Sequence, residues 1–333
     1  MTCHWSLVTV TIEAREETWP LKETFRISRG SRIETRVVVV RISDDGKIGR
    51  GEAVPIRRYD QTVDSVLAQI ESIKSRASLD RERLQELLPP GAARNAVDCA
   101  LWDLEAKRSS TRVWELAKTG AVAGVVTSFT ISLDSPEKMA AAATSARDLP
   151  MLKLKLGGDE LDLARVESVR KAAPNLRLLV DANESWKPEH YRNIALKLKS
   201  LGVEVIEQPF PADADDILEG LDHPVPICAD ESCHTAADLS DLKKRYEMIN
   251  VKLDKTGGLT GALDLCESAR GAGFKLLIGC MVGTSLSMAP ARVLASIADY
   301  VDLDGPLLLA RDRDNGLTYR NGKIGLPSRQ LWG

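Results

Sequence analysis

The chain has 333 residues, of which 44% are hydrophobic and 28% charged, and its formal net charge is −3 at pH 7. A slightly acidic chain gives no electrostatic reason to expect binding to nucleic acid or to an anionic membrane. No apolar run approaches the ~20 residues needed to span a bilayer, and the amino-terminal residues lack the basic and apolar segments of a signal peptide, so a cytoplasmic protein is expected.

The first part of the chain is predicted to form strands followed by helices. Alternation of apolar and polar residues predicts strands at residues 5–14, 36–42 and 48–53, the last two joined by the turn Asp44-Asp45-Gly46. A polar, mobile loop is expected at residues 19–30 and a second loop at 55–60. Helical periodicity follows at residues 62–75, 80–88 and 92–107. Residues 1–115 are therefore predicted to be an α+β domain.

From about residue 124, short apolar strands alternate with amphipathic helices. Strands are predicted at residues 125–131, 151–156, 177–180, 203–206, 226–229, 248–253, 275–278 and 300–303, with intervening helices at 159–173, 188–201, 236–244, 260–271 and 285–297. This alternation favours a closed parallel barrel over residues 116–315, with an open doubly wound sheet as the alternative. No Gly-x-Gly-x-x-Gly follows a strand, so a dinucleotide-binding fold has little support. Residues 316–333, with a turn at Asn321-Gly322, are expected to return to the first domain.

The cysteines and histidines carry no convincing catalytic or metal-binding motif. The six cysteines show no CxxC pairing and are expected to be reduced. Cys228, Cys233 and His234 lie close in sequence, but a zinc site would need further ligands at compact spacing.

Acidic residues follow three consecutive predicted strands. Asp181, Glu207 and Asp230 each stand at a strand carboxyl end, which is where barrel enzymes keep their catalytic residues. Three converging carboxylates repel one another unless they bind a cation, and oxygen ligands with room for water suit Mg²⁺. Each acid alone could instead cap the next helix, but their shared position favours a metal site.

Three lysines indicate proton-transfer chemistry. Lys153 and Lys155 are two apart on one predicted strand, so both project to the same face, while Lys252 lies across the barrel. A substrate carboxylate bound between them would have a lysine on each face of its α-carbon. A lysine can act as a base when neighbouring cations and partial burial lower its pKa. The pattern favours removal and return of an α-proton through a metal-stabilised enediolate; a surface position for Lys252 is the alternative.

These motifs together resemble one family over nearly the whole chain. They are Lys153-x-Lys155, Asp181-Ala182-Asn183, Glu207-Gln208-Pro209, Ala229-Asp230-Glu231-Ser232 and Asn250-x-Lys252, and they resemble the muconate-lactonising-enzyme subgroup of the enolase superfamily. The resemblance implies an α/β fold, a (β/α)₇β TIM-like barrel with an N-terminal α+β capping domain. It implies one Mg²⁺ per subunit on Asp181, Glu207 and Asp230. It also implies that Lys155 and Lys252 are the acid/base pair, and that Lys153 supports the substrate carboxylate and lowers the pKa of Lys155.

Features of the capping loops and the last strand point to the substrate. Asp302-x-Asp304 resembles the dipeptide epimerases, which implies binding of the α-ammonium of the substrate; a turn cap is the alternative. Residues 27–32 resemble the corresponding loop of L-Ala-D/L-Glu epimerases, and several arginines lie here and at 57–58. Arg29 is expected first to bind an anionic substrate side chain. Met281 is expected to contact substrate, although Gly283 replaces a glutamate found in many subgroup members.

The expected activity is Mg²⁺-dependent epimerisation of a dipeptide, L-Ala-D/L-Glu from cell-wall peptides first, at the α-carbon of its C-terminal residue. An N-acylamino-acid racemase or an o-succinylbenzoate synthase of the same subgroup is an alternative that would not need Asp302 and Asp304. More remote alternatives are a Schiff-base aldolase acting through Lys252 and a non-enzymatic binding protein. No nucleic acid or membrane partner is expected, and a homo-oligomer is compatible with the sequence.

Overall fold

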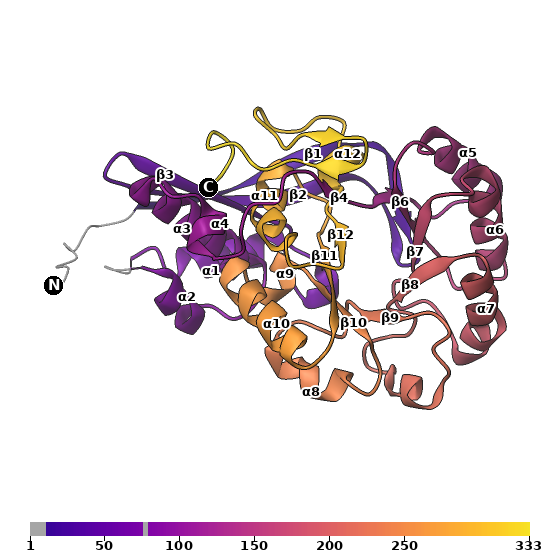
Figure 1. Ribbon diagram of the computed structural model, residues 1–333. Helices are drawn as coiled ribbons and strands as arrows, with labels where there is room; N and C mark the ends of the chain where they lie inside the picture. Colours follow the sequence, from indigo (N-terminus) through magenta and orange to yellow (C-terminus); the bar gives the residue numbers. More distant parts are fainter. Residues whose placement is uncertain (1–10, 76–78) are drawn as a thin grey trace.

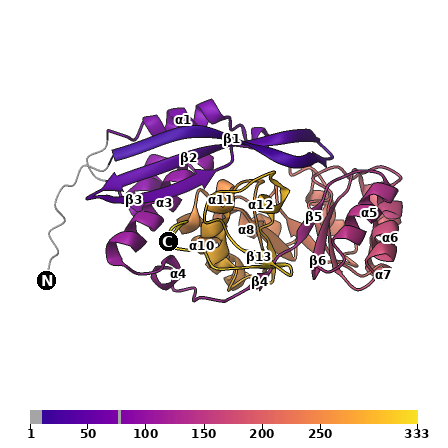
Figure 2. The ribbon, with the colours of Figure 1, turned by 90° about the horizontal axis from the view of Figure 1, so that it is seen from above.

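A long β-hairpin dominates the amino-terminal domain of the computed structural model, which describes residues 11–75 and 79–333. Strands β1 (Thr11–Ile27), β2 (Gly30–Asp44) and β3 (Lys47–Ala53) form an antiparallel sheet in that order. Figure 2 shows the hairpin of β1 and β2 extending from the capping helices toward β5. The predicted strand at residues 5–14 is confirmed at its described end, residues 11–14, and its first part lies outside the described residues.

The loop expected at residues 19–30 is wrong, because these residues form the far half of the hairpin. Trp19 pairs with Thr35, the register shifts between Pro20 and Phe25, and pairing then resumes from Phe25–Arg32 to Ile27–Gly30. The backbone hydrogen bonds of an antiparallel ladder do not require apolar side chains. The available signal was the alternation of Trp19, Leu21, Phe25 and Ile27, of which Leu21 is buried against Val282 and Leu309. The charged residues between them led to the prediction of a loop.

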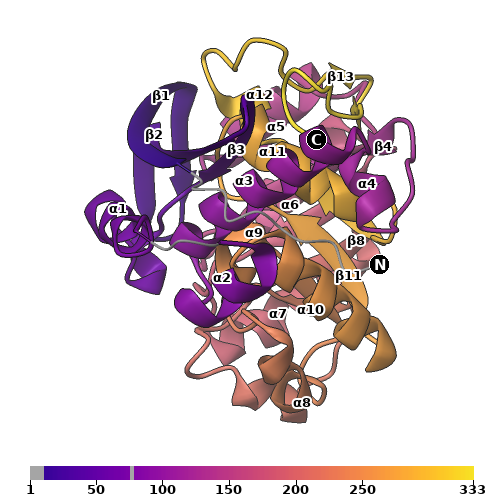
Figure 3. The ribbon, with the colours of Figure 1, turned by 90° about the vertical axis from the view of Figure 1, so that its left-hand side faces the viewer.

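The helices of the capping domain follow the sheet, and the longest of them packs on one of its faces. They are η1 (Arg57–Tyr59), α1 (Val63–Glu71), α2 (Arg81–Leu87), α3 (Ala92–Ser109) and α4 (Val113–Leu116). Helix α3 lies between the sheet and barrel helices α9 (Leu253–Thr256) and α10 (Leu259–Gly271) (Figure 3). A Cβ atom at Gly49 or Gly51 would clash with the backbone of α3, so these glycines permit the close approach of sheet and helix. The three predicted helices of this region are confirmed.

Eight parallel strands form the second sheet, arranged around the barrel in Figure 1. They are β5 (Phe129–Ile131), β6 (Met151–Lys155), β7 (Arg177–Asp181), β8 (Val203–Glu207), β9 (Ile227–Ala229), β10 (Met248–Val251), β11 (Lys275–Gly279) and β12 (Tyr300–Asp302). Their spatial order follows the chain from β5 to β12, without the reversal of a doubly wound sheet. The Ser128 N–H donates to the Val301 carbonyl over 2.9 Å and joins the two edges. The predicted barrel is therefore confirmed.

Helices and short turns follow these strands, and all but the last of them connect one barrel strand to the next. They are α5 (Pro136–Ser145), α6 (Asp162–Ala172), α7 (Pro188–Ser200), η2 (Asp216–Gly220), η3 (Ala236–Asp238), α8 (Leu239–Leu242), α11 (Ser285–Leu294) and α12 (Gly305–Leu308), besides α9 and α10. Buried side chains such as Leu152, Leu154 and Val180 point from the strands into this helical layer. Within the described residues, no helix is long and apolar enough to cross a membrane.

The first predicted barrel strand is in fact divided between two sheets. Strand β4 (Val125–Val126) pairs with β14 (Lys323–Ile324), which in turn pairs with β13 (Tyr319–Arg320), and only β5 joins the barrel. Beyond β14, the chain end reaches α3, where the Trp332 indole N–H donates to the Cys99 carbonyl over 3.0 Å. The carboxyl-terminal segment thus contacts both β4 and the capping helix α3.

Candidate active site

The barrel interior changes from apolar to charged along its strands. At the amino ends of the strands, buried apolar side chains form a plug that contains Met151, Leu179, Val205, Cys228, Met248 and Leu277. Successive side chains of a strand alternate between faces. The same inner face therefore carries Lys153 and Lys155 after Met151, and Asp181 after Leu179. Glu207, Asp230 and Lys252 follow by the same two-residue steps. Alternation alone thus brings the predicted charged residues to the carboxyl ends.

On one side of the barrel, lysines and carboxylates form a buried cluster. Lys153 Nζ lies 2.7 Å from Glu207 Oε2 and 3.3 Å from Asp181 Oδ2, and Lys155 Nζ lies 2.5 Å from Asp181 Oδ2. Burial by itself would lower the pKa of Lys153, but attraction to Asp302, Glu207 and Asp181 raises that pKa well above its usual value. Lys153 is therefore a cation fixed among three acids.

Two lysines hold Asp230 on the other side. Lys252 Nζ lies 2.6 Å from Asp230 Oδ2 and Lys255 Nζ lies 2.7 Å from Asp230 Oδ1. Burial opposes ionisation of Asp230, but both lysines together hold its pKa well below the usual range. Burial would likewise lower the pKa of Lys252, yet Asp230 and Glu207 raise it. Lys255 was not predicted; its spacing of three residues from Lys252, across the start of α9, brings it back to the same acid.

Lys155 and Lys252 lie on opposite sides of a common cavity. Strands β6 and β10 stand four places apart in the eight-stranded order, which is half-way around a closed barrel. Both lysines, together with Asp230 and Met281, line a cavity of about 830 Å³ beneath the capping domain. A small molecule in this cavity would have one lysine on each side.

The acids at the barrel mouth suit a divalent cation chemically. Glu207 Oε2 is buried with Lys153 Nζ 2.7 Å away, yet burial, followed by the charge of Asp181, raises the pKa of Glu207 to about 7. In this structure the Lys153 ammonium lies near the carboxylates of both Asp181 and Glu207. In residues 11–75 and 79–333, no group of three or more His, Cys, Asp or Glu side chains is positioned to bind a metal ion. The donors are nevertheless all carboxylate oxygens, which Mg²⁺ prefers, and a divalent cation would relieve the burial and repulsion that raise the pKa of Glu207 despite Lys153. Asp181, Glu207 and Asp230 therefore fit the group, provided that the Lys153 ammonium withdraws.

Asp302 and Asp304 lie at the carboxyl end of β12, beside β5 and the Lys153 cluster. Asp302 Oδ2 lies 2.7 Å from Lys153 Nζ, and the other oxygen accepts the Ser128 hydroxyl. Asp304 Oδ2 accepts the Thr130 N–H over 2.6 Å, whereas its side chain makes no hydrogen bond that would cap α12. The turn-cap alternative therefore finds no support. Burial and then the charge of Asp302 raise the pKa of Asp304 to about 7. Lys153 pairs with Asp302, and a second cation beside Asp304 would lower this pKa again.

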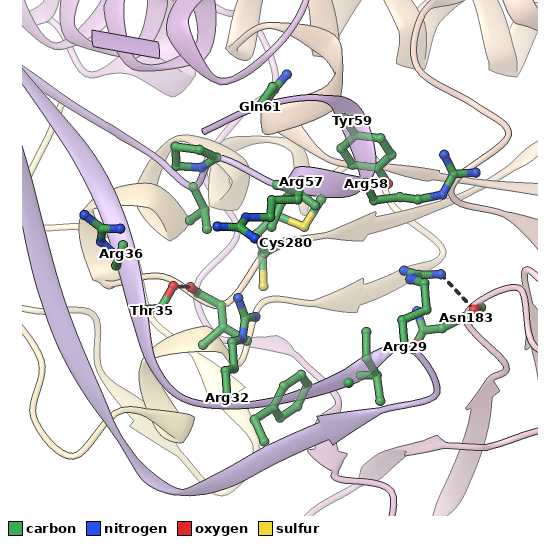
Figure 4. Close-up of a pocket in the computed structure, with 18 of the residues that line it drawn as sticks. Arg29, Arg32, Thr35, Arg36, Arg57, Arg58, Tyr59, Gln61, Asn183 and Cys280 are labelled. Atoms are coloured by element: carbon green, nitrogen blue, oxygen red, sulfur yellow. Dashed lines mark hydrogen bonds between the residues drawn. The ribbon is translucent and has the colours of Figure 1, made fainter. Parts of the chain in front are cut away.

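The capping arginines differ in whether they are already paired (Figure 4). Arg29 lies in the turn of the hairpin and lines the cavity, but its guanidinium donates to Glu184 over 2.8 Å and to Glu231 over 2.6 Å. Arg32, on β2, also points into the cavity (Figure 4) and has no hydrogen bond or ion pair within the described residues. Burial lowers the pKa of Arg32, as it does for a cation without an anionic partner. Arg29 stays a predicted substrate contact, and Arg32 is the better-placed cation.

Two acids of the site were not predicted. Glu184 and Glu231 each directly follow a residue of a predicted motif, and both contact Arg29. Glu231 Oε2 is buried without a hydrogen-bond partner. Glu184 follows the motif Asp181-Ala182-Asn183 directly and Glu231 lies within Ala229-Asp230-Glu231-Ser232, which was the available signal, but their arginine partner lies more than 150 residues away in the chain.

The glycine that replaces a subgroup glutamate is explained by a neighbouring acid. A Cβ atom on Gly283 would lie 2.5 Å from Ser287 Oγ and 3.1 Å from Glu52 Oε1. Glu52 is fully buried and accepts the Thr284 N–H over 2.8 Å, and its other oxygen accepts Arg313 Nη2 over 2.7 Å. A glutamate of the capping domain thus fills the space beside Gly283 and ties β3 to the loop after β11.

The chain is similar to known epimerases and racemases over most of its length. The L-Ala-D/L-Glu epimerase of Escherichia coli (strain K12) is 46% identical over 95% of this chain and 99% of its own length. The N-acetyl-D-glutamate racemase of a Pseudoalteromonas species is 44% identical over 89% of this chain and 95% of its own.

Solved structures agree with these sequence matches. An enolase family member from Agrobacterium tumefaciens, with homology to dipeptide epimerases and with bound sodium and L-Ala-L-Glu, is 45% identical with a TM-score of 0.95, covering 97% of this chain and 100% of the other. A dipeptide epimerase from Methylococcus capsulatus, complexed with Mg and L-Arg-D-Lys, is 31% identical with a TM-score of 0.90, covering 96% and 98%.

Both parts of the chain match one family. Residues 9–117 match the mandelate racemase/muconate lactonizing enzyme amino-terminal domain, and residues 137–330 match the enolase C-terminal domain-like family. These matches agree with the barrel, the capping domain and the charged strand ends. The chain therefore belongs to the mandelate racemase/muconate lactonizing enzyme family of the enolase superfamily.

Proposed function

We propose that this chain is an isomerase, a dipeptide epimerase that inverts the α-carbon of the C-terminal residue of L-Ala-D/L-Glu. The observation that carries the proposal is the placement of Lys155 and Lys252 on opposite sides of one cavity. The 46% identity to an L-Ala-D/L-Glu epimerase supports the choice of dipeptide. Epimerases and racemases among the relatives also favour this activity over the aldolase and binding-protein alternatives.

The two lysines would act on opposite faces of the substrate. Lys155, neutral when it acts as base, removes the α-proton of one epimer. Lys252, which Asp230 keeps protonated, returns a proton to the opposite face, and the roles exchange for the other epimer. Lys153 binds the substrate carboxylate. A bound Mg²⁺, held by Asp181, Glu207 and Asp230, would supply positive charge to that carboxylate as negative charge develops.

Arg32 would select an anionic side chain on the inverted residue. Arg32 and Arg57 both line the cavity without a hydrogen bond or ion pair to the described side chains, and Arg32 is the more buried of the two, so a substrate carboxylate would supply the missing charge. Charge-assisted hydrogen bonds of this kind are about twice as strong as neutral ones. Glutamate at the C-terminal position fits this demand, and Met281 lines the same cavity.

Asp302 and Asp304 would bind the α-ammonium of the first residue. The raised pKa of Asp304, to about 7, reflects burial and the neighbouring Asp302 charge, and a substrate cation would relieve both. A second candidate is N-acetylglutamate racemisation, which the 44% identity to a racemase of that kind supports. An acylated substrate has no α-ammonium, so the acidic pair favours the dipeptide.

Deuterium incorporation tests the proposal. L-Ala-L-Glu is incubated with enzyme and Mg²⁺ in D₂O, and mass spectrometry follows the α-carbon while chiral chromatography follows the epimer. We expect one deuterium per turnover and formation of L-Ala-D-Glu. Faster turnover of N-acetylglutamate than of the dipeptide would favour the second candidate, and no exchange with either would refute the proposal. A cytoplasmic location, a role in cell-wall peptide recycling and a homo-oligomeric state stay predictions.

A further inference from the structure

Two separate segments of the capping domain meet at one barrel carboxylate. The hairpin tip, here defined as Ser28 and Arg29, lies between β1 and β2, and the second segment is η1. Arg29 Nη1 lies 2.8 Å from Glu184 Oε2. Arg58 of η1 donates through Nε to Glu184 Oε2 over 2.8 Å and through Nη2 to Glu184 Oε1 over 2.7 Å. Both oxygens of Glu184 are therefore used to hold the capping domain.

Glu184 is itself held firmly by the barrel. Its side chain is 7% exposed, its N–H donates to the Gln208 carbonyl over 2.9 Å, and its Oε1 accepts the Ala212 N–H over 2.9 Å. Asn183 and Glu184 both adopt left-handed backbone conformations, with φ of 44° and 67°. Asparagine tolerates this region, but a glutamate rarely adopts it, so the conformation of Glu184 persists because surrounding contacts enforce it.

The same turn touches both the hairpin tip and the proposed metal ligands. The Asn183 carbonyl accepts the Ser28 hydroxyl over 3.1 Å and Arg29 Nη1 over 2.7 Å. The Asn183 N–H donates to Asp181 Oδ1 over 2.9 Å. Arg29, Arg58, Tyr59 and Asn183 all line the cavity. The turn after β7 therefore contacts the hairpin tip, which lines the cavity, and Asp181, a proposed metal ligand.

We propose that Glu184 is a positioning residue that couples the hairpin tip to η1, so that these two walls of the substrate cavity are ordered together. Each arginine is at least one-third exposed, with 34% for Arg29 and 40% for Arg58, so either ion pair alone is worth little. Because both arginines share one buried carboxylate, loss of Arg58 should also loosen the hairpin tip, and loss of Arg29 should also loosen η1. The inference rests on the proposed function only in taking this cavity as the substrate site.

The test measures amide hydrogen exchange at the hairpin tip and at η1 in the full-length protein. Glu184→Gln keeps the shape of the side chain and removes its charge. Arg58→Gln removes a contact from η1 alone. We expect faster exchange in both segments for both variants, so that Arg58→Gln loosens the hairpin tip, which it does not touch. Exchange faster only in η1 for Arg58→Gln would overturn the proposal.

A matched control comes from the same hairpin. Arg26 also pairs with a barrel acid, Asp134, over 3.2 Å, but neither residue lines the cavity. Asp134→Asn should leave exchange at the hairpin tip and η1 within the wild-type range. If Glu184→Gln and Asp134→Asn behave alike, coupling through Glu184 is refuted.

Kinetics give a second readout that separates positioning from folding. For Glu184→Gln we expect KM for L-Ala-L-Glu to rise about tenfold, equivalent to ~1.4 kcal/mol, while kcat and the melting temperature change little. An equal loss of kcat and stability without a change in KM would indicate a purely structural role. The exchange experiment needs no turnover, so wild-type inactivity would refute the proposed function and leave the coupling to be judged by exchange.

Discussion

Replacing Lys155 by alanine should separate proton exchange from epimerisation. With bases on opposite sides of the cavity, each lysine reaches the α-proton of only one epimer. Lys155→Ala leaves Lys252 in place, so one epimer should still exchange its α-proton for deuterium with retention of configuration. The other epimer should not exchange, and neither should be inverted. In Lys252→Ala the epimer that exchanges its α-proton should be the other one.

The size of the effect follows from the contacts of Lys155. A positioned acid or base is worth about 10²–10⁴-fold in rate, so epimerisation should fall at least ~10²-fold, or ~2.7 kcal/mol in activation free energy. The substitution also removes the cation 2.5 Å from Asp181, leaving Lys153 at 3.3 Å. Lys155→Met, which keeps the bulk but not the charge, should lose epimerisation equally and so show that the missing base causes the loss.

The assay treats L-Ala-L-Glu and L-Ala-D-Glu separately in D₂O. Mass spectrometry measures deuterium at the α-carbon, and chiral chromatography measures inversion. If both lysine variants lose exchange on the same epimer, the two-face arrangement is refuted. Epimerisation by Lys155→Ala at near the wild-type rate would refute the role of Lys155 itself.

Four further outcomes are expected. Treatment with EDTA should abolish exchange and added Mg²⁺ should restore it; activity in full chelator would contradict the metal site. Arg32→Gln should raise KM for L-Ala-L-Glu about tenfold or more but leave KM for L-Ala-L-Gln nearly unchanged, and an equal effect on both would show that Arg32 does not bind the side chain. Asp304→Asn should weaken dipeptide turnover more than any turnover of N-acetylglutamate, and no such difference would argue against the ammonium site. Asp254 accepts the Val54 N–H and the Asn95 amide on one oxygen, and burial raises its pKa to about 7. Since the pKa of an unfolded aspartate is about 3.9, the free energy of unfolding of the wild type should fall as pH rises from about 4 to about 7. Denaturant unfolding should therefore find Asp254→Asn more stable than the wild type at pH 8, by at most ~4 kcal/mol, and by less at pH 5.

The barrel and its charged mouth could be predicted because their signals are local. A strand that alternates like Met151-Leu152-Lys153-Leu154-Lys155 sends leucines to the helices and lysines to the interior in any parallel barrel. The position of Asp181, Glu207 and Asp230 at strand ends then brings them together without knowledge of any long-range contact. The confirmed fold and family depend on such local patterns.

The hairpin over residues 19–30 could not be predicted in this way. Its far half has an apolar face of Trp19, Leu21 and Phe25, but Val282 and Leu309 from the last part of the chain cover this face. The hairpin is also held by ladder hydrogen bonds and by backbone contacts with the barrel. Arg26, for example, accepts the Leu133 N–H over 3.0 Å through its carbonyl, more than 100 residues away in sequence. The division of residues 125–131 between β4 and β5 has the same cause, because β4 pairs with the last strands of the chain.

The choice between Arg29 and Arg32 shows why the substrate contacts were harder to predict than the catalytic lysines. Both arginines lie near the hairpin turn, and the sequence treats them alike. They differ because Glu184 and Glu231, from two barrel loops, neutralise Arg29 and no described residue neutralises Arg32. An arginine that the protein has already paired gains little from a substrate anion, since it would have to exchange one carboxylate for another. Substrate selection at this site therefore depends on which charge the folded protein leaves unpaired, and that is fixed only when the capping hairpin meets the barrel.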